Sequence, residues 1–429
     1  MKKFGINFKL VLISQIISLI GGNILRFALL LFILDLTQSA GIFGLVTAAS
    51  QIPIFLFAIP GGIIADRMNK KKLIVFFDGI KTVICACLLA IFLTGTYSVI
   101  NLTIVIAIFM AIVTLFLPIL TAATPVIVDQ DVLVEANGAI QAINAVSELL
   151  SFVLGGILVA TIGIINIIIL AGVAFLISTV IDLFIKISHK KQNVEFGIIK
   201  TAALDMKDSL HYAAKENPFI IKSSMIFAVM SLLFLPIFTV ALPYIVRIEF
   251  GVSDTMFGIS QAIPALGMLL GGVLSGKVKK WLNIKHFSKL ILIMALLCFM
   301  LAVALYTPLF GEAIALPFWL FNITLMIIMV FVMFGNITVM ALVQEQVPAN
   351  YLGKIIALVV TISNFATPVG QYVFGLLMEL FADGMSVLFI TIAILTFGVS
   401  TVAKIGFKSA VSSSQGESLT TLMKAIKKH

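Results

Sequence analysis

The sequence predicts an all-α membrane protein, with twelve transmembrane helices arranged as two pseudo-symmetric bundles of six. Of the 429 residues, 61% are hydrophobic and only 11% are charged, which is more apolar than a water-soluble domain with an ordinary charged surface. Apolar runs of about 20 residues recur along the whole chain, and each is long enough to cross a hydrocarbon core as an α-helix. The solvent of this chain is therefore lipid.

Each apolar run is assigned to one helix, and a polar stretch separates the sixth run from the seventh. We therefore expect an amino-terminal bundle (1–189), a cytoplasmic linker (190–217), a carboxy-terminal bundle (218–407) and a cytoplasmic tail (408–429). The predicted spans are 8–36, 40–65, 73–95, 98–124, 136–161, 164–187, 218–246, 255–276, 287–307, 314–341, 353–382 and 385–405.

The basic residues between the helices indicate the orientation. Lysines follow the second and eighth spans, whereas on the opposite side Arg247 is the one basic residue among several carboxylates. By the positive-inside rule the lysine-rich loops are cytoplasmic. We expect both termini in the cytoplasm and the protein in a plasma membrane, which we expect to be bacterial. The lysines are Lys70, Lys71, Lys72, Lys277, Lys279 and Lys280, and the carboxylates are Asp35, Glu249, Asp254, Glu312, Glu379 and Asp383.

Short matches between the two halves indicate an internal repeat. Phe43-Gly44 in the second span corresponds to Phe257-Gly258 in the eighth, and Gly61-Gly62 corresponds to Gly271-Gly272. Parallel repeats of six helices are typical of secondary transporters, in which the substrate site lies between the halves near the midplane of the membrane. The repeat therefore predicts a transporter.

The loop after the second span carries the most specific motif. It reads Gly62-Ile-Ile-Ala-Asp66-Arg67-Met-Asn-Lys70 and resembles the signature G-x-x-x-D-R-x-x-R/K of the major facilitator superfamily. Thr37-Gln-Ser-Ala and Ala123-Thr-Pro125 are similar to the macrolide-efflux branch of that superfamily. The resemblance implies its fold, and a secondary active exporter of hydrophobic drugs or related molecules that works by proton antiport with alternating access.

The resemblance also implies a gate at this loop, on the cytoplasmic side. Gly62, Asp66, Arg67 and Lys70 form its motif. We expect Asp66 to face the positive amino-terminal end of the eleventh helix near Gly353. The expected partners of Lys70 are Asp129 and Asp131.

Few charged side chains lie inside the predicted spans, and these are the candidates for proton coupling. An ionised side chain at the bilayer centre costs about 2.5–3.5 kcal/mol, so each needs a partner or a function. Glu148 lies on a polar helical face with Asn144, and Arg26 lies on a polar face with Gln15. We expect Glu148 to carry protons or another cation, with Arg26 as its partner or as the partner of an anionic substrate group. A structural hydrogen bond of Glu148 is the alternative.

Two further carboxylates lie one turn from a lysine. Asp78 and Lys81 are three residues apart, and Asp182 and Lys186 are four apart, which are spacings that permit ion pairs within a helix. Asp78 is a third candidate for proton coupling. The simpler interpretation is an ion pair within each helix, near the inner surface of the membrane.

Amide and methionine side chains on helical faces are the candidates for a substrate cavity. Methionine is flexible and polarisable, which suits a surface that accepts several ligand shapes, although plain helix packing explains such a face equally well. The cavity candidates are Gln15, Arg26, Asn144, Asn322, Met326, Met329, Met333, Asn336, Asn364 and Gln371.

The expected partners are a small-molecule substrate, protons or another cation, and the lipid bilayer. We expect no enzymatic activity, cofactor, metal or nucleic acid, and a monomer, because the basic residues lie between helices and no catalytic motif occurs. An exporter of a siderophore, a metallophore or a lipid is an alternative cargo assignment. A transport-incompetent sensor or scaffold is a second alternative, because the helix-5 motif of drug antiporters is incomplete at Ser151–Gly156 and no arginine lies between Lys81 and Lys186.

Overall fold

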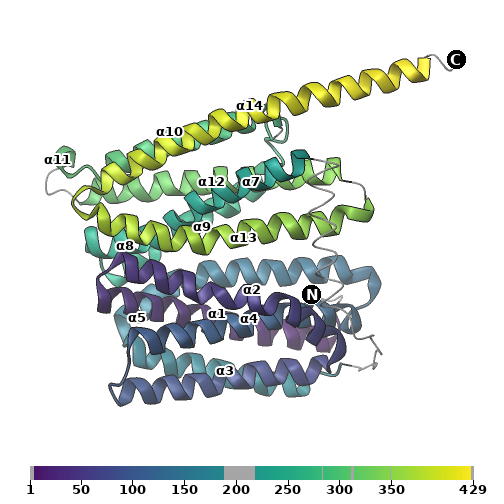
Figure 1. Cartoon of the computed structure of the whole chain (residues 1–429). Coiled ribbons are helices and arrows are strands. Elements are labelled where there is room, and N and C mark those ends of the chain that lie inside the picture. Colours follow the sequence, from purple (N-terminus) through teal and green to yellow (C-terminus); the bar gives the residue numbers. More distant parts are fainter. Residues whose placement is uncertain (1–3, 188–217, 283, 311–313, 348, 427–429) are drawn as a thin grey trace. The chain divides into compact units, whose positions relative to one another are not determined.

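The structure is a computed structural model, and it describes residues 4–187, 218–282, 284–310, 314–347 and 349–426 (Figure 1). The predicted linker (190–217) lies outside these residues. The side chains of Asp66 and Arg67 and the surroundings of Gly62 and Gly353 also lie outside the description, although the backbone of these residues is helical. Within the described residues the chain is almost entirely helical and has no strand.

The first half of the chain forms long apolar helices joined by short connections. Serine and asparagine side chains precede three of them, and each accepts a hydrogen bond from a backbone N–H of the first turn, which satisfies a donor that the helix leaves free. The helices are α1 (Ile6–Thr37), α2 (Ala40–Arg67), α3 (Lys70–Leu93), α4 (Val99–Ile127) and α5 (Leu133–Phe184), with the 3-10 turn η1 (Gln130–Val132) before α5.

A glycine breaks α5 into two arms. Gly163 has φ +73° and ψ 171°, a conformation that is essentially restricted to glycine. Its position separates the predicted fifth and sixth spans, 136–161 and 164–187. The continuous element therefore corresponds to two membrane crossings.

The second half begins with a helix that departs from regular α geometry. Between α7 (Pro218–Pro236) and the short α8 (Leu242–Tyr244) lies the π-helical turn η2 (Ile237–Ala241), and a second one, η3 (Ile245–Glu249), follows. Pro236 and Pro243 lie at these changes, and proline removes a backbone donor from the α-helical ladder. The later helices are α9 (Asp254–Ser275), α10 (Ile284–Ala304), α11 (Thr307–Phe310), α12 (Ala315–Gln346), α13 (Ala349–Leu380), η4 (Ala382–Gly384) and α14 (Met385–Ile426).

The chain divides into two compact units. Unit 1 comprises residues Met1–Lys200 together with Leu242–Ala262, and unit 2 comprises Thr201–Ala241 and Ile263–His429. The segment Leu242–Ala262, which includes η3 and the start of α9, thus belongs with the first-half helices. From the sequence we expected this segment in the carboxy-terminal bundle (218–407). The boundaries of the two bundles stay a prediction.

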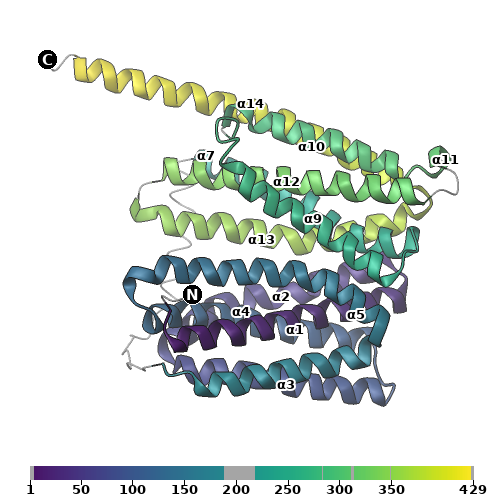
Figure 2. The ribbon, with the colours of Figure 1, turned by 180° about the vertical axis from the view of Figure 1, so that it is seen from behind.

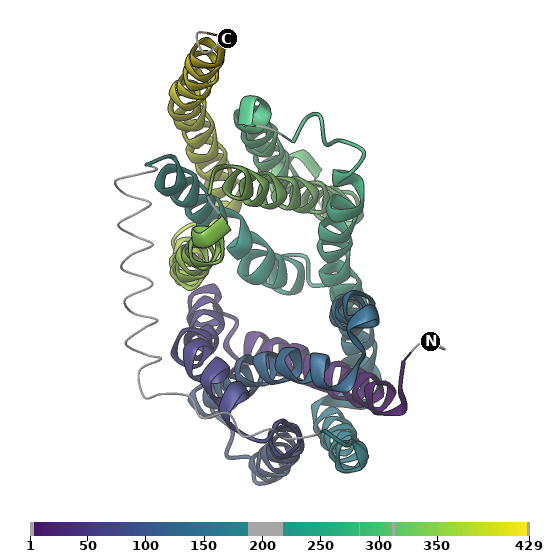
Figure 3. The ribbon, with the colours of Figure 1, turned by 90° about the vertical axis from the view of Figure 1, so that its right-hand side faces the viewer.

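The helices of each unit lie alongside one another, and Figure 3 views them nearly end-on. In unit 1, α1 packs mainly against α5, and α2 packs against α4. In unit 2, α7 packs against α13, and α10 against α14 (Figures 1 and 2). Glycine permits the closest of these approaches: a Cβ atom on Gly370 of α13 would lie 2.5 Å from the carbonyl oxygen of Leu232 in α7. Small residues at such positions let membrane helices touch through their backbones.

The helix lengths fit twelve membrane crossings. Ten candidate spans are found in the described residues, and one of them, Gln130–Phe184, contains both arms of α5. The 32-residue α13 is a further helix of sufficient length. Large hydrophobic side chains such as Leu93, Ile100 and Val273 are exposed on the helices, as expected of surfaces that contact lipid. The predicted tail (408–429) continues α14 as a helix to Ile426.

Candidate functional site

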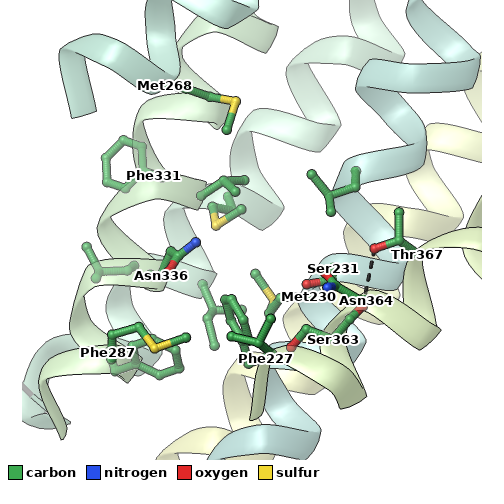
Figure 4. Close-up of a pocket in the computed structure, with 18 residues that line it drawn as sticks. Phe227, Met230, Ser231, Met268, Phe287, Phe331, Asn336, Ser363, Asn364 and Thr367 are labelled. Carbon is green, nitrogen blue, oxygen red and sulfur yellow. Dashed lines mark hydrogen bonds between the residues drawn. The ribbon is translucent and has the colours of Figure 1, made fainter. Parts of the chain in front are cut away.

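Unit 2 contains a cavity of about 380 Å³, which falls within the range of small-molecule sites. Five helices contribute to it: α7, α9, α10, α12 and α13 (Figure 4). Its residues come from the second half of α7, the first half of α10, the last part of α12 and the middle of α13. Under the predicted orientation, the start of α10 and the end of α12 lie on the cytoplasmic side of the membrane.

The lining of this cavity is apolar and aromatic, and none of the described residues in it is charged. Three phenylalanines, four methionines and five leucine, isoleucine and valine residues line it, together with hydroxyl and amide groups. The aromatic and methionine residues are Phe227, Phe287, Phe331, Met230, Met268, Met294 and Met340, and the polar ones are Ser231, Asn336, Ser363, Asn364 and Thr367. Such a lining suits an uncharged hydrophobic ligand with a few polar groups.

The free polar groups of the cavity in the described residues are two amides and the hydroxyl of Ser231. Ser363 donates a hydrogen bond to the carbonyl oxygen of Val359, and Thr367 donates to that of Ser363, so both hydroxyl protons are used within α13. Asn336 and Asn364 have no hydrogen-bond partner among the described residues, and Figure 4 shows them on opposite sides of the cavity. Each amide offers donors and an acceptor to a ligand.

The face of methionines and asparagines that was predicted on the tenth span lies on α12, and its residues differ in their surroundings. Asn336 lines the cavity, whereas Met326 and Met333 pack against Gly267 and Gly271 of α9. Met329 is fully buried. None of these three methionines lines this cavity, and their role in substrate binding stays a prediction.

Two predicted cavity amides also serve the fold instead of this cavity. Asn322 is fully buried and donates a hydrogen bond to the carbonyl oxygen of Phe318 in its own helix. Gln371 is fully buried and donates to the Thr239 hydroxyl across the contact between α13 and η2. Buried amides need partners, and the packed helices supply them.

A smaller cavity of about 100 Å³ lies inside unit 1, where the predicted polar face of the first helix points. Gln15, Arg26 and Lys81 are among its lining residues. The Gln15 amide donates to Asn144 Oδ1 of α5 at 3.2 Å, so the faces predicted on these two helices meet. Arg26 Nη1 lies 3.8 Å from the sulfur of Met110.

The expected pairing of Arg26 with Glu148 is not found. Glu148 is exposed on α5 and has no hydrogen-bond or ion-pair partner among the described residues, whereas Arg26 faces the cavity of unit 1. The helical spacing places Glu148 on the same side as Asn144, but the buried part of that side begins beyond it, at Ser151 and Gly155. Its role in proton coupling stays a prediction.

The two intrahelical ion pairs have different outcomes. Lys81 Nζ lies 2.6 Å from Asp78 Oδ1, which confirms the first pair, and both side chains are more than 90% buried. The second pair is not formed: Lys186 is exposed, and Asp182 instead accepts a hydrogen bond from Ser14 of α1. Asp182 turns inward because α5 packs against α1 on that side.

The expected ion pairs of the gate residue Lys70 are also absent from the described residues. Lys70 is half-buried, and Asp129 and Asp131 are exposed in the turn before α5. No ion pair joins them. The other motif residues have side chains outside the described part of the chain, and their gating role stays a prediction.

Arg247 forms an ion-pair cluster that the sequence did not predict. Its guanidinium binds the carboxylate of Asp35 at the end of α1 through two bonds, Nε to Oδ1 at 2.6 Å and Nη2 to Oδ2 at 2.8 Å. Nη1 lies 2.7 Å from Asp254 Oδ1 and donates to the carbonyl oxygen of Val252. The arginine therefore holds the segment Leu242–Ala262 against the end of α1, within unit 1. The opposite charges of Asp35, Arg247 and Asp254 were the only signal of this cluster in the sequence.

Comparison with known proteins identifies the family. The sequence profile of the Major Facilitator Superfamily matches residues 11–371. The chain belongs to this superfamily. Members of the superfamily are transporters and not enzymes, which confirms the predicted fold class and the absence of an enzymatic function.

Similar proteins place the chain within the superfamily. Macrolide efflux protein A of Streptococcus pyogenes is 24% identical over 380 residues, which cover 87% of this chain and 89% of that protein. A bacterial homologue of the iron transporter ferroportin, solved in an inward-facing state, aligns with TM-score 0.66 and 14% identity over 94% and 98% of the two chains. A D-xylose–proton symporter aligns with TM-score 0.68 and 15% identity over 92% and 96%. The solved structures support the superfamily fold, and the efflux protein fits the predicted macrolide-efflux branch.

Proposed function

We propose that this protein exports uncharged hydrophobic small molecules of macrolide type across a bacterial cell membrane by alternating access and proton antiport. The observation that carries the proposal is the 380 Å³ cavity of unit 2, with its aromatic and methionine lining and two free amides. An ionised ligand would find no opposite charge among its described lining residues, whereas an apolar molecule with carbonyl or hydroxyl groups would bind both its surface and its amides.

The similarity to macrolide efflux protein A supports the direction of transport, and the predicted orientation puts the cavity where a cytoplasmic ligand would reach it. The Arg247 cluster supports alternating access, since it is a contact between the outer end of α1 and the segment Leu242–Ala262 that can open. We retain the motif residues around Asp66 as the inner gate, and Arg26, Asp78 and Glu148 as residues that act in proton coupling.

An anionic cargo such as a siderophore is the second candidate, because the cavity of unit 1 carries Arg26 and Lys81. Its volume of about 100 Å³ is below the range of about 300–1,000 Å³ that drug-sized ligands occupy. This observation favours the neutral cargo. A scaffold without transport activity has no use for either cavity.

Ligand-induced stabilisation of the purified protein tests the proposal. A ligand that binds only the folded form raises the melting temperature, by an amount set by its concentration relative to Kd. We expect a macrolide to stabilise the wild type, and Phe331→Ala, which removes a lining ring, to weaken binding about tenfold or more. Phe365→Ala is the matched control, since this phenylalanine is 59% exposed and outside the cavity lining. Equal stabilisation of the wild type and both variants would show that the macrolide does not bind in this cavity.

A further inference from the structure

A buried chain of oxygen atoms joins two carboxyl groups inside unit 1, and we call it the oxygen chain. Ser14 Oγ lies 2.5 Å from Asp182 Oδ1 and 2.7 Å from Ser178 Oγ, and the Ser178 hydroxyl lies in turn at Asp78 Oδ2. The four side chains come from α1, α3 and the second arm of α5, and each is at least 97% buried. Two carboxyl groups are thus connected through two hydroxyls, away from water.

The charges of this group do not balance if both carboxyls are ionised. Lys81 Nζ lies 2.6 Å from Asp78 Oδ1 and 3.0 Å from the Ser18 hydroxyl, so its charge compensates Asp78. Asp182 forms no ion pair among the described residues, and its Oδ2 atom has no hydrogen-bond partner there, so Lys81 is one cation for two carboxyl groups. An uncompensated carboxylate is unfavourable in a buried site, and binding a proton removes that charge.

The number of protons in the oxygen chain leads to the same conclusion. Three oxygen–oxygen contacts follow one another from Asp182 through Ser14 and Ser178 to Asp78. Two ionised carboxylates leave only the two hydroxyl protons, so one contact would bring oxygen lone pairs together without a hydrogen between them. One additional proton on a carboxyl gives each contact a hydrogen bond, all donated in the same direction along the chain.

Few charged groups influence this proton. Those that the structure shows around the oxygen chain are Asp78 and Lys81 of α3 and Asp182 of α5, and Arg26 of α1 lines the same cavity as Lys81. The ring of Phe116 in α4 lies 4.8 Å from Lys81 Nζ. Lys81 also lines the cavity of about 100 Å³, so the buried group borders a space large enough to hold water molecules.

We propose that Asp78 and Asp182 share one exchangeable proton and that the exporter exchanges this proton for its substrate. The inference rests on the proposed proton-driven export and names the site at which the proton binds. Uptake forms one O–H bond on a carboxyl, release breaks it, and rotation of the Ser14 and Ser178 hydroxyls moves the proton's position between the two ends. No other covalent bond changes.

Infrared difference spectroscopy of the purified protein tests the shared proton without any substrate. We expect the wild type to show the carbonyl stretch of a protonated carboxylic acid, which disappears as the pH is raised. Asp78→Asn and Asp182→Asn should each lose this band, because the one remaining carboxylate is then balanced by Lys81. Asp383→Asn, which changes an exposed carboxylate, should keep it. A wild type without the band, or a band that survives in both buried variants, would overturn the inference.

Transport into vesicles whose cytoplasmic face points outward separates the proton site from the proposed function. With a lumen one pH unit more acidic than the medium, each coupled proton drives about tenfold accumulation of a labelled macrolide. We expect Asp182→Asn to exchange labelled for unlabelled macrolide but to accumulate none, whereas Asp383→Asn, at an exposed carboxylate, accumulates it as the wild type does. Accumulation by Asp182→Asn equal to that of the wild type would overturn the site and leave export standing. A wild type that moves no macrolide would instead contradict the proposed function, and the infrared result would still decide whether the proton is shared.

The hydroxyls supply a second set of variants, which keep both carboxyl groups. Ser14→Ala and Ser178→Ala each interrupt the oxygen chain, so we expect the infrared band to shift and accumulation to fall. Glu148→Gln provides the comparison with the other carboxylate proposed for coupling. Loss of accumulation in Glu148→Gln together with normal accumulation in Asp182→Asn would assign the proton to Glu148 and contradict the oxygen chain.

Discussion

Removal of the Arg247 side chain should loosen the segment Leu242–Ala262 from unit 1. The guanidinium makes two charge-assisted bonds to Asp35, at 2.6 and 2.8 Å, in the bidentate geometry that makes such pairs strong. The side chains are partly exposed, 22% for Arg247 and 34% for Asp35, so water weakens the interaction. We therefore expect Arg247→Met to lower the free energy of local opening of the segment Leu242–Ala262 by about 1–2 kcal/mol. This change corresponds to a factor of about 5–30 in the opening equilibrium.

Hydrogen–deuterium exchange measures this equilibrium, since amides exchange through local opening. Peptides that cover Leu242–Ala262 should exchange about 5–30 times faster in Arg247→Met than in the wild type. Glu249→Gln is the control: this carboxylate lies two residues away, is exposed, and has no partner among the described residues. Asp35→Asn should add little in an Arg247→Met background, because both changes remove the same contact. Unchanged exchange in Arg247→Met, or equal acceleration in the control, would refute the role of the ion pair.

Three further substitutions test the fold and the cavity. Gly163→Ala should lower the free energy of unfolding by about 1–3 kcal/mol, because a backbone φ of +73° strains any residue other than glycine. The control is Gly398→Ala, whose new Cβ atom meets no neighbouring atom and should leave stability unchanged or slightly higher. Equal effects of the two substitutions would contradict the role of backbone strain at Gly163. Gly370→Ala should cost about 1–3 kcal/mol, because the new Cβ would lie 2.5 Å from the carbonyl oxygen of Leu232; an unchanged melting temperature would show that α7 and α13 are less closely packed. Asn364→Leu should leave the melting temperature unchanged and weaken macrolide binding about three- to tenfold, and unaltered binding in a titration would exclude this amide as a ligand contact.

The helices were predictable from the sequence because the solvent is lipid. A helix that crosses a membrane needs a long apolar run, and its ends need polar caps, so the predicted span 40–65 and the observed α2 (Ala40–Arg67) nearly coincide. The π-helical turns η2 and η3 were not predicted. Proline marked their neighbourhood, but a proline permits a kink, a break or a wider turn, and the sequence alone does not choose among them.

The site was less predictable than the helices. Helical periodicity shows which residues share a face of one helix, but not which other helix packs against that face. The spacing of Gln15 and Arg26 correctly indicated a polar face, and the structure adds that this face borders a cavity within unit 1. The same reasoning assigned Asp182 to Lys186, because both lie one turn apart, whereas the side chain turns to Ser14 on a helix far away in the sequence. Pairings between helices depend on packing, which no local pattern in the sequence records.

Efflux of a labelled macrolide from preloaded bacterial cells tests the central claim most directly. Cells that produce the wild-type protein should lose the label faster than cells that produce Phe331→Ala at the same level, and dissipation of the proton gradient should abolish the difference. Equal rates in the two strains, or a difference that persists without the gradient, would contradict export through the cavity of unit 2 driven by protons.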